Sequence, residues 1–165
     1  MSEFALIDKA VVLARLREQL QRELTTALGS QQRTQTAATH EESRPENDKD
    51  TRALESSYLA RGQAGRVVEL AAAVASLAAL SLRPFAKDTP IALSALIELD
   101  DGQRRNFYFM APAGGGQSVL VADRALLVLT PNAPLGRALI GRRIGDSVEV
   151  RTPQGLREYE VVSVA

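Results

Sequence analysis

The sequence predicts an α+β protein: a long antiparallel helical hairpin of coiled-coil type, followed by a small antiparallel β domain with one short helix. Three observations lead to this fold class. Leucines recur at spacings of three, four and seven in two stretches of the first 84 residues, which is typical of helices with one apolar face. A segment with prolines follows at residues 84–90. Beyond it, short runs rich in β-branched and aromatic residues alternate with glycine turns, which is typical of strands.

The first predicted helix covers residues 6–37. Its apolar positions lie on one face, and no proline occurs before Pro45. Beyond Gly29 the segment is polar, so the helix either continues as a solvated rod or frays there. Each arm has roughly 30 residues, which predicts a rod about 45 Å long at 1.5 Å per residue. The expected apolar face consists of Leu6, Leu13, Leu16, Leu20, Leu24 and Leu28.

The second predicted helix begins after the polar segment at residues 39–50 and ends at Pro84. The alanines at residues 71–79 permit close approach of the two helices at the base of the hairpin. We expect Tyr58 and Leu59 to pack inside the hairpin. The whole expected apolar face consists of Leu54, Tyr58, Val67, Leu70, Val74, Leu77 and Leu80. The predicted domains are therefore residues 1–84, a hairpin with an acidic tip at about residues 40–50, and residues 85–165, the β domain.

Six strands and a short helix are expected in the β domain. The run PLGRALIG at residues 134–141 is predicted to be a helical turn. The glycines at residues 114–116 lack a following Lys-Ser/Thr pair, so we expect a hairpin loop there and no phosphate cradle. The predicted strands are IALSALIEL, NFYFM, SVLVAD, ALLVLTP, SVEVRT and REYEVVSV.

The composition excludes several classes of function. Twenty basic and 20 acidic residues cancel, so we expect no independent sequence-specific nucleic-acid binding. The absence of cysteine and the single His40 argue against thiol catalysis, disulfides, multi-histidine metal sites and a cofactor of the chain's own. The apolar stretch at residues 70–82 is shorter than the roughly 20 residues that cross a bilayer. We therefore expect a cytoplasmic protein without a membrane partner.

The segment TPNAPLGRALIGRRIGDSVEVRTPQGLREYEVVSV, residues 130–164, resembles the C-terminal signature of the bacterial GreA/GreB transcript cleavage factors. The resemblance implies an FKBP-like β domain without isomerase activity, and an accessory factor that is not itself an enzyme. It implies bacterial RNA polymerase as the partner, with the β domain near the rim of the secondary channel and the hairpin inside it. The RNA 3′ end would be met only within that complex. The polymerase contacts that it suggests are Asn47, Pro134, Gly136, Arg137 and Arg142.

The hairpin tip departs from the family pattern Gly-Asp-x-x-Glu-Asn. Glu46 and Asn47 match its Glu-Asn pair, which puts Ser43 at the position of the metal-binding aspartate. Residues 41–50 still hold five acidic residues against two basic ones. The resemblance thus implies Glu46, with Glu42 or Asp48, as candidate ligands for Mg²⁺ in the polymerase active site, where carboxylate oxygens are suitable ligands.

Other interpretations stay open. Ser43-x-x-Glu46 also fits a capping box at the start of the second helix, in which case the tip only caps and solubilises the hairpin. The missing aspartate favours a non-cleaving competitor or inhibitor that occupies the polymerase channel. A regulator resembling the nucleoside diphosphate kinase regulator group is a third possibility, although its hairpin is shorter. An autonomous isomerase is least supported, because few aromatic residues are present to line a pocket: Phe107, Tyr108, Phe109 and Tyr159.

Overall fold

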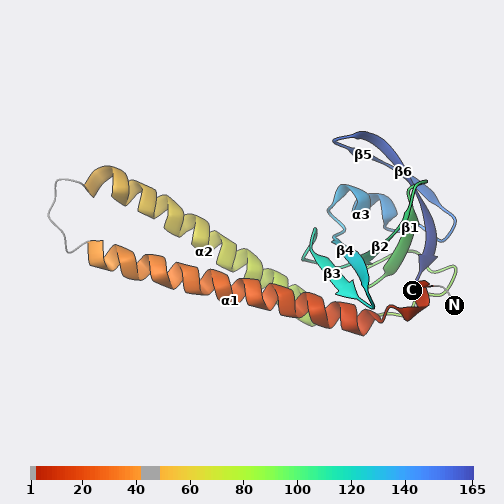
Figure 1. Cartoon of the computed structure of the whole chain (residues 1–165), viewed down its shortest axis with the longest axis horizontal. Coiled ribbons are helices and arrows are strands. Elements are labelled where there is room, and N and C mark those ends of the chain that lie inside the picture. Colours follow the sequence, from red (N-terminus) through yellow and green to blue (C-terminus); the bar gives the residue numbers. More distant parts are fainter. Residues whose placement is uncertain (1–2, 42–48) are drawn as a thin grey trace. The chain divides into compact units, whose positions relative to one another are not determined.

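The computed structural model describes residues 3–41 and 49–165 (Figure 1). A 3-10 turn at Glu3–Leu6 precedes two long helices, α1 at Lys9–Glu41 and α2 at Lys49–Ala79. Six strands and a short helix follow. The strands are β1 Leu96–Asp100, β2 Arg105–Met110, β3 Ser118–Val121, β4 Arg124–Leu129, β5 Ser147–Thr152 and β6 Gly155–Val164, and helix α3 is Pro134–Leu139. All six predicted strands and the short helix are confirmed, as is the α+β fold class.

The helix α1 extends beyond Gly29 to Glu41, so the first arm continues as a solvated helix. Leu6 lies before this helix, in the 3-10 turn, and its side chain is exposed. The expectation that Leu6 belongs to the apolar face of the first helix is therefore wrong. The turn between them is fixed by Asp8, whose Oδ1 accepts the backbone N–H of Ala10 at 2.8 Å, as an N-terminal capping residue does.

The strands form one sheet in the order β3-β4-β2-β1-β6-β5. All neighbouring pairs are antiparallel except β2 and β4, which are parallel, with Phe107 opposite Leu126. The expectation of a wholly antiparallel sheet is thus wrong for this pair. The physical reason is the path of the chain: β3 takes the sheet edge and turns back, so β4 returns beside β2 in the same direction.

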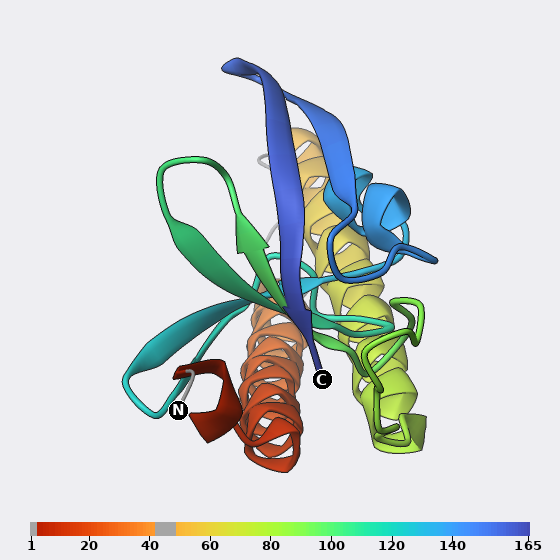
Figure 2. The ribbon, with the colours of Figure 1, turned by 90° about the vertical axis from the view of Figure 1, so that its right-hand side faces the viewer.

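Both faces of the central strands are covered. One face packs on α3, with a core that includes Ile97, Tyr108, Met110 and Leu139. Figure 2 shows α3 beside the β5 and β6 strands. On the other face, the ring of Phe4 stacks on that of Phe107 with 6.3 Å between centroids. Burial on both faces explains why β2 contains a continuous apolar run at residues 107–110, without the polar alternation of a half-exposed strand.

The chain divides into two compact units, residues 18–75 and residues 1–17 with 76–165. The division differs from the expected boundary at residues 84–85, because both ends of the predicted hairpin belong to the unit with the sheet. Val12 and Leu16 are fully buried there, and Arg15 donates from Nη1 to the carbonyl of Leu120 in β3. Arg17 donates from Nε to the carbonyl of Leu77 at 2.9 Å. The first two turns of α1 therefore form part of the core of the unit of residues 1–17 and 76–165, which is called the β unit below.

Candidate functional site

The candidate metal ligands at the hairpin tip lie outside the described residues. Glu42, Glu46 and Asp48 fall within residues 42–48, as do Asn47 and Ser43. The proposed metal ligands, the proposed contact of Asn47 and the alternative of a capping box therefore stay predictions. What the structure does define is the pair of helices that carries the tip: α1 ends at Glu41, and α2 begins at Lys49.

Inside the unit of residues 18–75, buried apolar contact is confined to one end of the helices. Leu20 of α1 and Leu70 of α2 are each 3% exposed. One turn further out, Arg66 donates from Nη2 to Oε2 of Glu23 at 3.0 Å. None of residues 21–40 or 51–69 is buried. The outer arms are thus held by helix propensity and polar contacts, without a hydrophobic seam.

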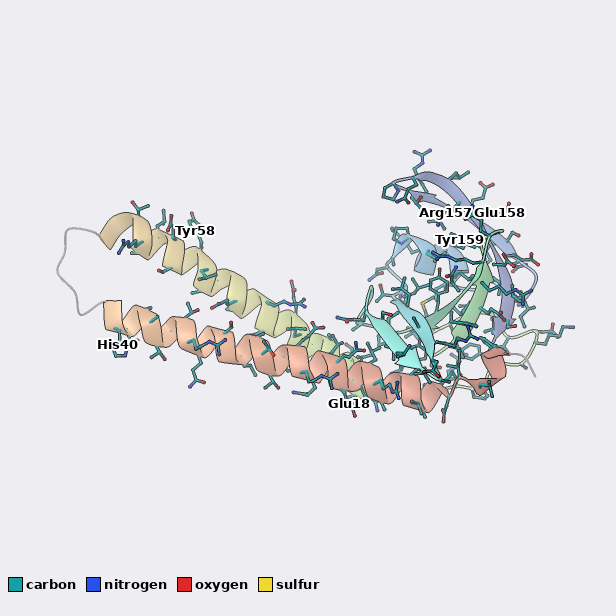
Figure 3. All side chains as sticks on the ribbon, in the orientation of Figure 1. Glu18, His40, Tyr58, Arg157, Glu158 and Tyr159 are labelled. Carbon is teal, nitrogen blue, oxygen red and sulfur yellow. The ribbon has the colours of Figure 1, made fainter. Side chains whose placement is uncertain are left out.

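In this outer part of the helices, residues of the expected apolar face are not buried. Leu28, Leu54 and Leu59 are exposed, and Tyr58 is 64% exposed on the outer part of α2 (Figure 3). The expectation that Tyr58 and Leu59 pack inside the hairpin is therefore wrong. A three-four spacing of apolar residues marks a helix face, but it does not show whether a partner helix approaches closely enough to cover that face.

An open groove of about 510 Å³ lies between the arms. Oε1 of Gln63 is buried in the hairpin and has no hydrogen-bond partner among the residues that the structure describes, an arrangement that costs free energy. The arms here meet through polar side chains. The groove is lined by Gln19, Arg22, Glu23, Thr26, Ala27, Ser30, Arg66 and Leu70.

In the β unit, the motif at residues 134–141 is organised by one glycine. A Cβ atom at Gly136 would lie 1.9 Å from the carbonyl oxygen of Thr130, which is a backbone atom and cannot move aside easily. That carbonyl also accepts the N–H of Ala133 at 3.1 Å, in the turn that leads into α3. The glycine is therefore required for α3 to pack against the end of β4.

The remaining motif residues divide into core and surface. Leu139 is fully buried, whereas Ile140 is 40% exposed. Gly141 ends the helix at φ 81°, and its N–H bonds to the carbonyl of Ile91 at 2.9 Å. Three of the four predicted polymerase contacts in this unit are exposed, namely Pro134, Arg137 and Arg142, while Gly136 is buried. The fixed short helix thus presents Pro134 and Arg137, and Arg142 is exposed just beyond it.

Asp101 and Tyr108, near the sheet, have shifted pKa values. The N–H groups of Arg104 and Gln103 bond to Oδ1 of Asp101 and lower the pKa of this carboxyl. Burial raises the pKa of the Tyr108 hydroxyl, and Tyr159 adds to this effect. Within residues 3–41 and 49–165, no group of three or more histidine, aspartate or glutamate side chains could hold a metal ion.

Sequence reasoning missed two charged clusters. Glu98 of β1 is buried, and its Oε1 lies 3.4 Å from Nη1 of Arg105. Lys9 and Arg83, which are 74 positions apart in the chain, meet at the ring of Phe85. The signal for the first cluster was Glu98 itself, since a glutamate among the apolar residues of a strand needs a partner. No local pattern predicts the second cluster.

No helix within the described ranges has both the length and the apolar character needed to span a membrane.

Comparison with known proteins gives three findings. Residues 121–165 match the family model described as "Transcription elongation factor, GreA/GreB, C-term". The chain is 36% identical over 101 residues to a transcription elongation factor GreA from Xanthomonas campestris pv. campestris, an overlap that covers 61% of each protein. It is 34% identical over 77 residues to the transcription inhibitor protein Gfh1 of Thermus thermophilus, covering 45% of this chain and 46% of that protein.

Among solved structures, that of GreA factor homolog 1 (Gfh1) from Thermus thermophilus is similar at a TM-score of 0.38, with 22% sequence identity. The similarity covers 90% of this chain and 94% of that one. The chain matches about three fifths of the length of its GreA relative. The matched part includes α3, the exposed arginines and the β5–β6 pair. Residues 121–165 are thus similar to the C-terminal domain of the GreA/GreB transcription elongation factors.

Proposed function

We propose that this chain is an accessory factor of bacterial RNA polymerase that binds at the secondary channel and stimulates cleavage of backtracked RNA by the polymerase. The observation that carries the proposal is the combination of a GreA/GreB C-terminal domain at residues 121–165 with two helices of 33 and 31 residues. Such a partner would place the protein in the bacterial cytoplasm.

The two parts of the chain have different roles in this proposal. The β unit would dock through Pro134 and Arg137, exposed on the helix that Gly136 fixes in place, and through Arg142, exposed just beyond that helix. The helices would carry the acidic tip. Outer arms with little buried apolar surface fit a channel whose walls supply the contacts that the free hairpin lacks.

At the tip, Glu46 with Glu42 or Asp48 would offer carboxylate oxygens to the polymerase site. Bound Mg²⁺ supplies Lewis-acid stabilisation of the phosphoryl group, and it is commonly held by one or two carboxylates together with phosphate oxygens and water. The carboxylates of this chain would hold and orient the ion; the reacting groups belong to the polymerase and the RNA.

The test is a stalled, backtracked polymerase complex supplied with Mg²⁺, in which shortening of the RNA from its 3′ end is measured. We expect the wild-type chain to accelerate shortening. Glu46→Ala should lose at least about tenfold of this acceleration while polymerase binding is kept, since one charge-bearing ligand is worth several kcal/mol. Glu55→Ala, an exposed glutamate of α2, is the matched control and should stay within about twofold.

A second candidate function is a non-cleaving inhibitor that occupies the same channel. Ser43 at the position of the family's aspartate favours it, and one relative carries the name transcription inhibitor protein. Polymerase binding without any acceleration of RNA shortening would establish this function. Ser43→Asp would then restore cleavage if the missing carboxylate is the cause. The long helices disfavour a regulator with a short hairpin.

A further inference from the structure

An unusual pair of cations lies where the chain passes from the helices to the sheet, within the unit of residues 1–17 and 76–165. Nζ of Lys9 lies 4.8 Å from the centroid of the Phe85 ring, and the guanidinium carbon of Arg83 lies 5.5 Å from it. Each distance is within the range of a cation–π contact. The two positive groups therefore share one aromatic ring.

Hydrogen bonds fix the ammonium group of Lys9 and the main chain of Arg83. Nζ of Lys9 donates to the carbonyl of Arg83, and the N–H of Arg83 bonds to Oγ of the buried Ser94 at 2.9 Å. Ser94 has a φ of 71°, so the segment of residues 82–88, which carries Arg83 and Phe85, is anchored by a residue in a restricted conformation. The ammonium group of Lys9 and the backbone of Arg83 are therefore fixed, and the guanidinium of Arg83 reaches the ring through its own side chain.

Within residues 3–41 and 49–165, no carboxylate is paired with this positive charge. Among the side chains that the structure describes, none forms an ion pair with Lys9 or Arg83. Asp8, the adjacent acidic residue, already accepts a backbone N–H at the start of α1. Burial lowers the pKa of Lys9, and the charge of Arg83 lowers it further, as expected for two like charges in proximity.

Two further basic side chains, Lys87 and Arg143, lie on or beside the same segment. Lys87 is exposed in the turn at residues 86–89, and Arg143 donates from Nε to the carbonyl of Asp88 at 3.0 Å. The carboxylate of Asp146 accepts the backbone N–H of Arg143 at 2.8 Å. Leu82, 36% exposed, and half-buried Phe85 add apolar surface. Residues 82–88 with Lys9 and Arg143 are called the strap surface below.

We propose that the strap surface is a docking site for an acidic segment of a partner protein, in which a carboxylate binds between Lys9 and Arg83 and an apolar neighbour contacts Phe85. Charge complementarity supports this occupant, since a bound anion relieves the repulsion between the two cations. The surface is short and mixes cations with apolar groups. A nucleic-acid backbone instead favours an extended row of basic residues. Residues 85–165 have no such excess, because they contain as many acidic as basic residues.

This inference does not depend on the proposed function, because neither the hairpin tip nor the α3 motif enters it. It can therefore be tested without polymerase. The full-length chain is titrated, by NMR chemical-shift mapping, with a 12-residue peptide of glutamate and leucine and separately with a ribonucleotide oligomer of equal formal charge. We expect the peptide to shift the Phe85 ring signals and the Lys9 side-chain signals, and to bind more tightly than the RNA oligomer.

The variants separate this site from general attraction between charges. Lys9→Gln with Arg83→Gln should weaken peptide binding about tenfold, while the conservative pair Lys9→Arg with Arg83→Lys should retain binding within about threefold. Arg151→Gln with Arg157→Gln removes two exposed arginines of β5 and β6 in the same unit and serves as the matched control. Equal weakening in the control, tighter binding of the RNA oligomer, or unchanged Phe85 signals would each overturn the proposal. Superposable amide spectra of the variants establish that each one is folded.

Discussion

At the scale of the residue, Gly136 has the clearest structural requirement. Its Cα lies against the Thr130 carbonyl, so that any side chain would meet backbone. We predict that Gly136→Ala lowers the free energy of unfolding by about 1–3 kcal/mol or more, the usual cost of overpacking a tight contact. Urea denaturation of the full chain measures this. Arg137→Ala, one residue along on the exposed side of α3, should change stability by less than about 0.5 kcal/mol. A similar loss in both variants would contradict the explanation.

Asp101 gives a prediction about pH at the same scale. Two backbone N–H groups lower its pKa below the ordinary value of 3.8, so the folded state favours the carboxylate. This contribution to stability is present above about pH 3.8 and is lost as the pH falls through the lower value of the folded state. The stability difference between the wild-type chain and Asp101→Asn should therefore shrink between pH 7 and pH 3. Urea denaturation at both values checks this, and a difference that is independent of pH would contradict it.

At the scale of the element, the outer hairpin contains glycines that packing does not require. Added Cβ atoms at Gly62 and Gly65 would meet nothing within 4 Å, and one at Gly29 would meet only Nη1 of Arg33 at 3.6 Å. Each glycine costs a helix interior about 1 kcal/mol relative to alanine. The outer parts of the two helices are thus less stable than helices of the same length without these glycines would be.

Replacing two of these glycines should strengthen α2. We predict that Gly62→Ala with Gly65→Ala stabilises the helix by up to about 2 kcal/mol, which slows local hydrogen exchange of the α2 amides roughly tenfold or more. Arg61→Ala is the control, because arginine and alanine have similar helix propensities and Arg61 is exposed. If exchange in α2 is unchanged by the double substitution, helix propensity is not what limits the stability of this arm.

The buried end of the hairpin should behave differently from its outer part. Leu70→Ala removes one of the two leucines that are almost fully buried in the unit of residues 18–75, and should cost about 2–5 kcal/mol. Leu59→Ala, at an exposed position of the same helix, should cost less than about 0.5 kcal/mol. Hydrogen exchange of the α2 amides measures the loss of stability in both variants. Equal effects would mean that Leu59 is covered in solution.

At the scale of the whole molecule, the start of α1 belongs to the β unit. A chain that begins at residue 85, the boundary expected from the sequence, would lack Phe4, Val12 and Leu16, which are buried. We predict that residues 85–165 alone lose cooperative thermal unfolding. In the control, residues 1–23 are joined to 66–165 by a short glycine-serine linker, which keeps these side chains and should unfold cooperatively. A cooperative transition in the shorter fragment would contradict this assignment of the core.

The sequence predicted much of the fold, because local patterns encode it. The strands and α3 follow from alternating or β-branched runs between glycine turns, and these signals need no information from distant residues. The parallel pairing of β2 with β4 could not be predicted, since strand order depends on which pairing buries the sheet completely. Likewise, the exposure of Leu54 and Tyr58 depends on the distance between α1 and α2, which residue spacing along one helix does not encode.

The candidate site divides in the same way. The motif at residues 134–141 and the acidic tip are each contiguous in the chain, so the sequence by itself determined the resemblance of the C-terminal segment to GreA/GreB factors and the arginines and carboxylates from which the function is proposed. Only the tertiary structure decided that Gly136 is required for packing and that Lys9 meets Arg83 over Phe85. These are contacts between segments far apart in the chain. They arise when helix and sheet bury apolar surface against each other, and no spacing along the chain records them.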